Sequence, residues 1–183
     1  MRLFRSFRDD RALQRGSASY VAALMVEPAT ADVDWLSGSA TRGDTDHATW
    51  ELRYLRRAVG IVVAQRDALD DRTPSEVLRT LASRMERDPN VDGTLRELAD
   101  RQFNARLSAY RDALTSRGHG TPSTRVAQNL LAFAGGPIRA NDPAVVRGAA
   151  LVLEYLRSST EMLQASFGTA ELPDDIPPSQ VAR

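Results

Sequence analysis

The chain has 183 residues, and its 24 basic side chains are all arginines, balanced by 24 acidic side chains. The absence of lysine and cysteine excludes a lysine Schiff base, a phosphate-loop lysine, a thiolate nucleophile, a disulfide and a cysteine-ligated zinc site. Because the net charge is zero, no overall electrostatic attraction to nucleic acid or to an anionic membrane is expected.

This length corresponds to one domain, or to one domain with extensions. No apolar run approaches the roughly 18 to 20 residues that span a bilayer. The first sixteen residues, MRLFRSFRDDRALQRG, carry charges throughout and do not resemble a secretory signal. We therefore expect a cytoplasmic protein.

The N-terminal region predicts an arm followed by little regular structure. Residues 1–16 form a basic amphipathic segment, and residues 17–26 predict a short buried helix that Pro28 closes. Residues 29–45 are polar and are expected to form a loop, with Trp35 and Leu36 as its anchor.

A long helix is predicted from residue 46 to about Asp71. Its apolar residues form two adjoining stripes, which predict contact with two neighbouring helices instead of one. One stripe contains Leu52, Leu55, Val59, Val62 and Leu69, and the other contains Trp50, Tyr54, Ala58, Ile61 and Ala68.

A short helix and a long helix follow. Thr73, Pro74 and Glu76 form a helix-start pattern in which the threonine is the expected cap, and the short helix should cover residues 74–87. The long helix should continue from about Gly93 to Arg117. Its expected buried face contains Leu95, Leu98, Phe103, Leu107, Tyr110 and Leu114.

The same order is repeated in the last third of the chain. Thr121 and Pro122 predict the start of a short helix over residues 122–134, and Pro143 starts a long helix that ends at Phe167. This last helix has few charges, so it is expected to lie at the centre of the bundle. Its predicted buried stripe contains Val146, Ala149, Leu153, Leu156, Leu163 and Phe167.

These elements predict an all-α fold: an antiparallel bundle of about five to six helices, three long and two to three short. The predicted domain limits are an arm over residues 1–16, the bundle over residues 17–168, and a proline-rich tail over residues 169–183 that is disordered or draped over the surface.

Two groups of acidic residues are candidate metal ligands. Asp67, Asp70 and Asp71 share one helix face, and with Glu97 and Asp100 they suggest a magnesium-dependent, all-α nucleotide or diphosphate hydrolase. The length of the short helix between the groups argues against their convergence, and the alternative is a solvated helix end.

Asp88, Asn90 and Asp92 match the first half of a calcium-binding loop, with Gly93 in the sixth position. Ala99 stands at the twelfth position, where such loops place a bidentate glutamate, so a corner between helices is the preferred interpretation.

The N-terminal arm is the candidate partner-binding segment. It combines Arg2, Arg5 and Arg8 with Phe4 and Phe7, a pattern that fits an acidic partner or weak peripheral membrane contact through residues 1–15. Packing of the arm against the bundle is the alternative.

The expected function is a non-enzymatic helical protein, an accessory or structural subunit that binds another protein through its bundle surface and arm. No cofactor and no nucleic acid are expected, and the sequence leaves a homo-oligomer open. The alternatives are the magnesium-dependent hydrolase and a helical regulator that holds an apolar small ligand between helices.

Overall fold

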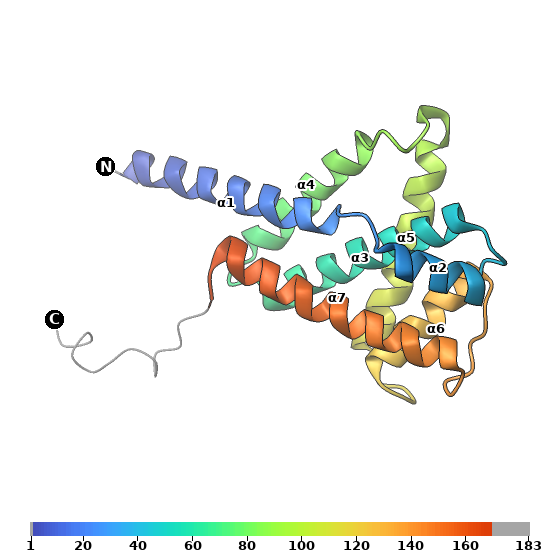
Figure 1. Cartoon of the computed structure of the whole chain (residues 1–183). Coiled ribbons are helices and arrows are strands. Elements are labelled where there is room, and N and C mark those ends of the chain that lie inside the picture. Colours follow the sequence, from blue (N-terminus) through green and yellow to red (C-terminus); the bar gives the residue numbers. More distant parts are fainter. Residues whose placement is uncertain (1, 170–183) are drawn as a thin grey trace, which may run out of the picture.

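The computed structural model describes residues 2–169, with side chains from residue 9 onward. This part of the chain is all-α and contains seven α-helices, one 3₁₀ turn and no β-strand (Figure 1). The all-α prediction is therefore confirmed, although seven helices replace the expected five to six. The elements are α1 (Arg2–Leu24), α2 (Thr30–Ser39), α3 (Thr45–Asp67), α4 (Arg72–Glu86), η1 (Gly93–Leu95), α5 (Arg96–Thr115), α6 (Pro122–Ala134) and α7 (Pro143–Phe167).

Helix α3 is the centre of the molecule. Thirteen of its 23 residues are buried, and it packs against α2, α4, α5, α6 and α7. Its two apolar stripes predicted two neighbouring helices, and the structure has more. The helix was expected to continue to Asp71 but ends at Asp67, and Leu69 of the predicted stripe is 55% exposed. Gly60 lets α1 approach closely, because a side chain there would collide with the side chain of Leu24. The Tyr20 hydroxyl donates a hydrogen bond to the Gly60 carbonyl at 2.9 Å.

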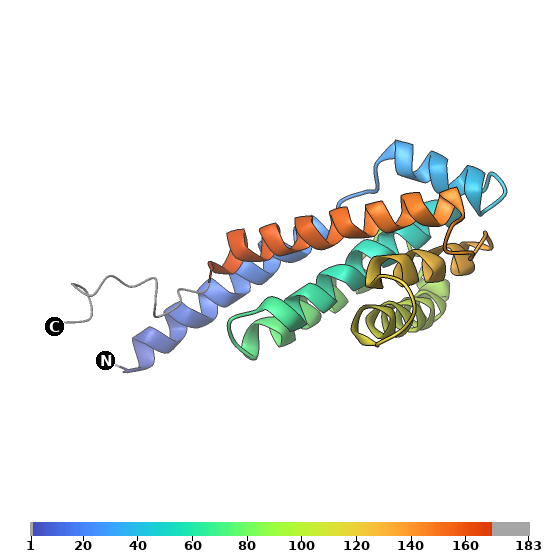
Figure 2. The same ribbon diagram turned by 90° about the horizontal axis from the view of Figure 1, so that it is seen from below.

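Helix α7 lies at the outside of the bundle, so its predicted central position is wrong (Figures 1 and 2). Only seven of its 25 residues are buried. The apolar stripe that was predicted to be buried is also displaced around the helix from the stripe that is buried. Val146 and Leu153 of the predicted stripe are 59% and 57% exposed. The stripe that is buried contains Val145, Gly148, Leu151, Val152, Tyr155, Ser159 and Leu163.

The N-terminal third is more helical than expected. Residues 2–24 form the single helix α1, and the predicted loop over residues 29–45 contains α2. Tertiary packing explains α2, since Leu36 is fully buried and Trp35 lies against Gly148 of α7. Gly16 of α1 lies against Phe167 of α7, where a larger side chain would not fit.

The two threonines predicted to cap short helices behave differently. Thr121 caps α6, because its side chain accepts a hydrogen bond from the Thr124 backbone. Thr73 does not cap α4: this helix begins one residue earlier, at Arg72, and Thr73 is buried within it. Asp70 takes the role instead, and its carboxylate accepts hydrogen bonds from the backbone N–H groups of Arg72 and Thr73 at 2.8 and 2.7 Å.

Candidate binding groove

A groove opens between α4 and α5. Both helices pack against α3 but have little contact with each other, and in Figure 1 they diverge from the loop that joins them. The groove has a volume of about 550 Å³, which lies within the roughly 300–1,000 Å³ typical of ligand sites.

The floor of this groove is apolar and its rim is polar. Ile61 of α3, Leu81 of α4 and Phe103 of α5 form the buried floor, while Leu78 at the edge is 36% exposed. Glu86 and Asp100 lie on the rim, and neither is in an ion pair within the described part of the chain. Arg79, also on the rim, is paired with Glu76. The rim therefore has two unpaired carboxylates over an apolar floor.

A buried ion pair ties the loop between α4 and α5 to the central helix. The Arg57 guanidinium donates to the Asp88 carboxylate at 3.1 Å, and the exposed fractions of the two side chains are 3% and 4%. Burial favours a raised pKa for Asp88, but hydrogen bonds from Asn90 and Arg57 outweigh it and hold that pKa below its usual value. Burial also lowers the pKa of Arg57.

A second ion pair, between the buried Glu51 and the half-buried Arg106, joins α5 to α3. Arg106 donates to both carboxylate oxygens of Glu51, through Nε at 3.2 and 3.1 Å. The guanidinium lies 4.5 Å from the centre of the Phe133 ring. Burial disfavours the charged form of Arg106, but the contacts with Glu51 outweigh this effect and raise its pKa. His47 lies beside the pair, with its Nε2 atom 3.4 Å from Glu51.

The two ion pairs explain why the groove stays open. They hold the Asp88 loop and the middle of α5 on α3, so α5 does not need to pack on α4 to be stable. Breaking a buried pair is costly because the remaining charge has lost its partner. The positions of α3, α4 and α5 therefore form the groove.

An aromatic patch lies on the opposite face of α5. Leu95 and Leu98, which were predicted to be buried, are 55% and 43% exposed. They surround a hollow of about 150 Å³ with Trp50 and Tyr54. The Arg53 guanidinium lies 4.5 Å from the centre of the Trp50 ring. Tryptophan, tyrosine and arginine are the residues most enriched among energetic hot spots of protein interfaces.

The five predicted magnesium ligands do not come together. Within the described residues no group of three or more histidine, aspartate or glutamate side chains could hold a metal ion. Asp67 is paired with Arg66 and accepts a hydrogen bond from Thr160, and Asp70 caps α4. Asp71 is exposed at the start of α4. Glu97 is 93% exposed beside Arg101, and Asp100 lies on the groove rim.

The three predicted calcium ligands are used for local structure. Asp88 accepts hydrogen bonds from the Asn90 backbone and side chain at 3.1 and 3.0 Å, in addition to its pair with Arg57. Asp92 caps η1 through the Thr94 backbone at 2.8 Å. The segment is the corner between helices that was the preferred interpretation of the sequence.

The predicted partner-binding residues Arg2, Phe4, Arg5, Phe7 and Arg8 belong to α1, but their side chains lie outside those that the structure describes. The backbone of this part of α1 extends past the end of α7 (Figures 1 and 2). Within the described residues no helix combines the length and apolarity that a bilayer crossing requires.

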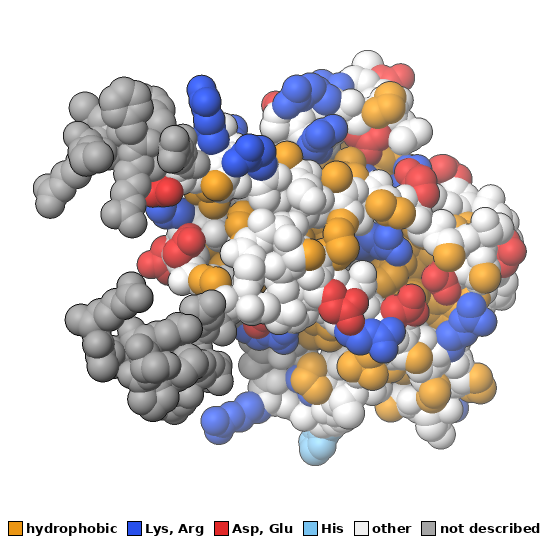
Figure 3. All heavy atoms as spheres, turned by 60° about the vertical axis from the view of Figure 1, so that its left-hand side comes forward, with side chains coloured by type: hydrophobic (Ala, Val, Ile, Leu, Met, Phe, Trp, Pro, Cys, Tyr) orange, Lys and Arg blue, Asp and Glu red, His pale blue; other side chains and the backbone are white. Residues whose placement is uncertain are grey.

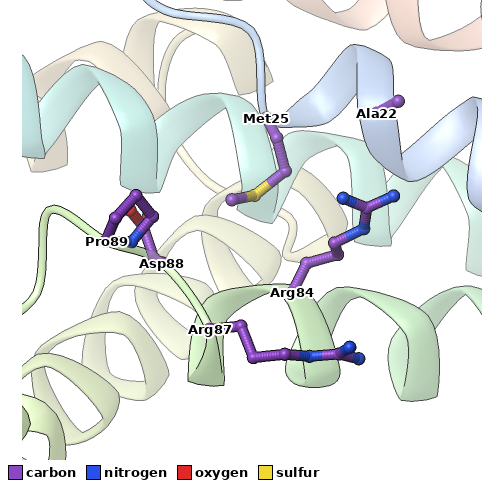
Figure 4. Close-up of a pocket in the computed structure, with 6 residues that line it drawn as sticks. All are labelled: Ala22, Met25, Arg84, Arg87, Asp88 and Pro89. Atoms are coloured by element: carbon purple, nitrogen blue, oxygen red, sulfur yellow. The ribbon is translucent and has the colours of Figure 1, made fainter.

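A smaller hollow of about 210 Å³ lies between the C-terminal ends of α1 and α4 (Figure 4). Met25 points into it, and the guanidinium groups of Arg84 and Arg87 point in different directions. Arg87 donates to the Ser83 carbonyl of its own helix at 3.0 Å. The two cations therefore do not converge on a common anion. Acidic and basic side chains are interspersed on the face shown in Figure 3.

The chain is therefore an all-α protein with an open groove between two of its helices. Comparisons with family models, with curated proteins and with solved structures gave no significant match.

The sequence did not reveal the groove. Its floor residues were predicted to be apolar and inward-facing, which is the same pattern that a closed helix pair would give. Arg57 and Arg106, which stand beside apolar residues in the sequences of α3 and α5, were the available signal, because an arginine close to a core requires a carboxylate partner.

Proposed function

We propose that this chain is a protein-binding helical subunit that holds an amphipathic helix of a partner in the groove between α4 and α5. The proposal is based on an apolar groove between two helices that no other part of the described residues covers. Helix-in-groove recognition uses this geometry, with apolar residues of the guest helix at intervals of three and four residues. The cytoplasmic location expected from the sequence remains part of this proposal.

The rim defines the chemistry of the partner helix. Glu86 and Asp100 are available carboxylates on the rim, so a guest helix with arginine or lysine beside its apolar ridge fits better than an acidic one. Leu78 is the most exposed of the large apolar side chains that line the groove and would meet the guest directly.

A library of amphipathic helices with a constant apolar ridge and varied flanking charges tests this proposal. We expect the purified chain to select helices with basic flanks and to bind them less tightly as salt increases. Leu78→Arg should weaken binding at least tenfold without unfolding the protein, since this side chain is partly exposed.

Leu69→Arg is the matched control, because Leu69 is also an exposed leucine (55%) and does not line the groove. Selection of no helix, or equal weakening by both variants, would contradict the proposal. Capture of a natural partner by the wild type and by Leu69→Arg, but not by Leu78→Arg, would show that the groove also binds a partner in the cell.

A second groove supports a second candidate function, in which the chain is a helical regulator that binds an apolar small ligand. It has a volume of about 560 Å³ and lies between α3, α5, α6 and α7. Val62, Leu114 and Leu156 line it, and Arg66 and Arg111 lie at its edge. This arrangement suits an amphiphile with a carboxylate. Displacement of a fluorescent fatty acid, weakened by Arg111→Glu and not by Leu78→Arg, would support it, and no binding of the probe would exclude it.

A further inference from the structure

Helix α7 has an apolar stripe that no part of the described chain covers. Val146 and Leu153 are one heptad apart, so they lie on the same side of the helix, and both are more than half exposed. Ala150 lies between them and is also exposed. We call Val146, Ala150 and Leu153 the α7 seam.

The seam is unusual for an exposed helix face. The helix already buries a separate stripe against the bundle, so the seam is a second apolar stripe on a helix that needs only one. Two aliphatic residues at seven-residue spacing beside a small one is a pattern typical of helix–helix contacts. Arg147 and Glu154 are also one heptad apart, so both lie along the same edge of the seam, and Arg157 follows Ala150 by seven residues at the end of the seam.

The charges make the seam complementary to itself. Ala150 is the centre of the seam along the helix. Val146 lies four residues before it and Leu153 three residues after it, while Arg147 lies three residues before it and Glu154 four residues after it. If two α7 helices cross antiparallel with Ala150 at the centre, each Val146 meets Leu153 of the other copy. Each Arg147 then lies beside Glu154 of the other copy. A parallel arrangement would instead place equal charges together.

We propose that the α7 seam is a homodimer interface, in which a second copy of this chain packs antiparallel across a two-fold axis through Ala150. The two-fold axis makes every contact occur twice, as in other isologous interfaces. Alanine at the centre lets the two helices approach closely. The seam shares no residue with the groove between α4 and α5, so the dimer does not depend on helix binding there. Leu153 also lines the second groove, so a dimer through the seam would compete with an apolar ligand at that edge.

Neighbouring residues hold the charged edge of the seam in place. The Arg147 guanidinium donates to the Ala31 carbonyl at 3.2 Å, lies 3.5 Å from Asp32, and lies over the Trp35 ring. Its position is therefore fixed by α2 before a second copy arrives. One pair of helices buries less surface than a standard protein interface, so we expect a reversible dimer that forms at micromolar concentrations.

The absence of cysteine allows a direct test by cross-linking. In Ala150→Cys, the two engineered thiols face each other at the axis, within the separation of about 4.4–6.8 Å between Cα atoms that a disulfide needs. We expect mild oxidation to give a covalent dimer at micromolar concentration. Ala165→Cys is the matched control on the same exposed helix, about 22 Å from the axis, and should cross-link at least tenfold more slowly.

Charge reversal distinguishes this interface from nonspecific association. Arg147→Glu and Glu154→Arg each place equal charges together in their own dimers, and each should weaken association about tenfold in sedimentation equilibrium. An equimolar mixture of the two variants should restore association, because the mixed dimer pairs opposite charges again. Val146→Glu should weaken self-association by more than either charge reversal.

Circular dichroism shows whether each variant is folded, so loss of structure is separable from loss of association. A wild-type chain that stays monomeric at several hundred micromolar would overturn the proposal. Equal cross-linking at positions 150 and 165, or a mixture that associates no better than either variant alone, would overturn it as well.

Discussion

The helix pairs α4–α5 and α6–α7 begin from similar sequences and form different structures. Each pair has a threonine and a proline at or within the start of its short helix, and a loop connects this helix to a long one. Helices α6 and α7 pack closely, whereas α4 and α5 separate and leave a groove. Small residues explain the close pair: a side chain on Gly148 of α7 would be only 3.0 Å from Ala127 of α6.

The open pair depends on buried charge instead of small residues. Asp88 is attached to Arg57, and Arg106 of α5 is attached to Glu51, so the chain after α4 is directed along α3. Apolar periodicity therefore determines which residues face inward, while small residues and ion pairs determine how closely two helices approach.

Removal of Asp88 should have the largest effect on stability. Asp88→Ala leaves the buried Arg57 guanidinium without its partner, and we expect a loss of about 3–5 kcal/mol in the free energy of unfolding. Urea denaturation measures it. The double replacement Arg57→Met with Asp88→Leu should be much less harmful, because no charge remains buried. A double variant as unstable as the single one would show that the pair itself was not the cause.

Enlargement of Gly148 should affect the closed pair. Gly148→Val introduces carbon atoms between Ala127 and Trp35, and we expect a loss of about 1–3 kcal/mol from overpacking. Gly38→Val is the control for the added side chain, because nothing lies within 4 Å of the position where its Cβ would be. Equal losses in thermal unfolding would mean that close packing is not required at Gly148.

The stability that Asp88 provides should depend on pH. Its pKa is lower in the folded state than in the unfolded state, because hydrogen bonds from Asn90 and Arg57 outweigh burial. The contribution is therefore present above the unfolded pKa of about 4 and is lost as the pH falls through the lower folded pKa. The difference in unfolding free energy between wild type and Asp88→Asn should be constant above about pH 5 and shrink below about pH 4. If the difference in unfolding free energy grew as the pH fell, the pKa of Asp88 would be higher in the folded state than in the unfolded state, which would contradict this account.

The smallest expected effect is the loss of stability when Thr121 or Thr73 is replaced, and it should differ between the two positions. Thr121→Val removes the cap of α6 and should cost about 1 kcal/mol. Thr73→Val should cost less, because Asp70 already satisfies the first backbone N–H groups of α4. Chemical denaturation of both variants checks this difference. Equal costs would mean that Thr73 supports the start of α4 after all.

Local signals predicted most of the helices. Proline and capping residues gave the bounds of α6 and α7 correctly, because these signals act through the nearest backbone N–H groups. Helix α2 was missed because its short sequence has weak helical preferences and is held by Trp35 and Leu36 against other helices. Such contacts between distant residues leave no local pattern.

The candidate sites were harder to predict than the fold. In α7 two apolar stripes adjoin, and the sequence could not show which one faces the bundle, so the exposed Val146 and Leu153 were assigned to the core. Leu95 and Leu98 were misplaced for the same reason. The groove itself arises from the angle between α4 and α5. This angle depends on the contacts of both helices with α3, and the apolar periodicity of α4 or α5 does not predict it.

The separation of α4 and α5 in solution is the quantity that most directly decides whether the groove is preformed. Spin labels on Arg84→Cys and Ala105→Cys, in a chain that otherwise has no cysteine, report this distance by pulsed electron paramagnetic resonance. We predict one narrow distance distribution that agrees with the separated helices and broadens when Asp88 is replaced by alanine. A broad distribution in the wild-type background, or a second population with the helices closed on each other, would contradict a built groove.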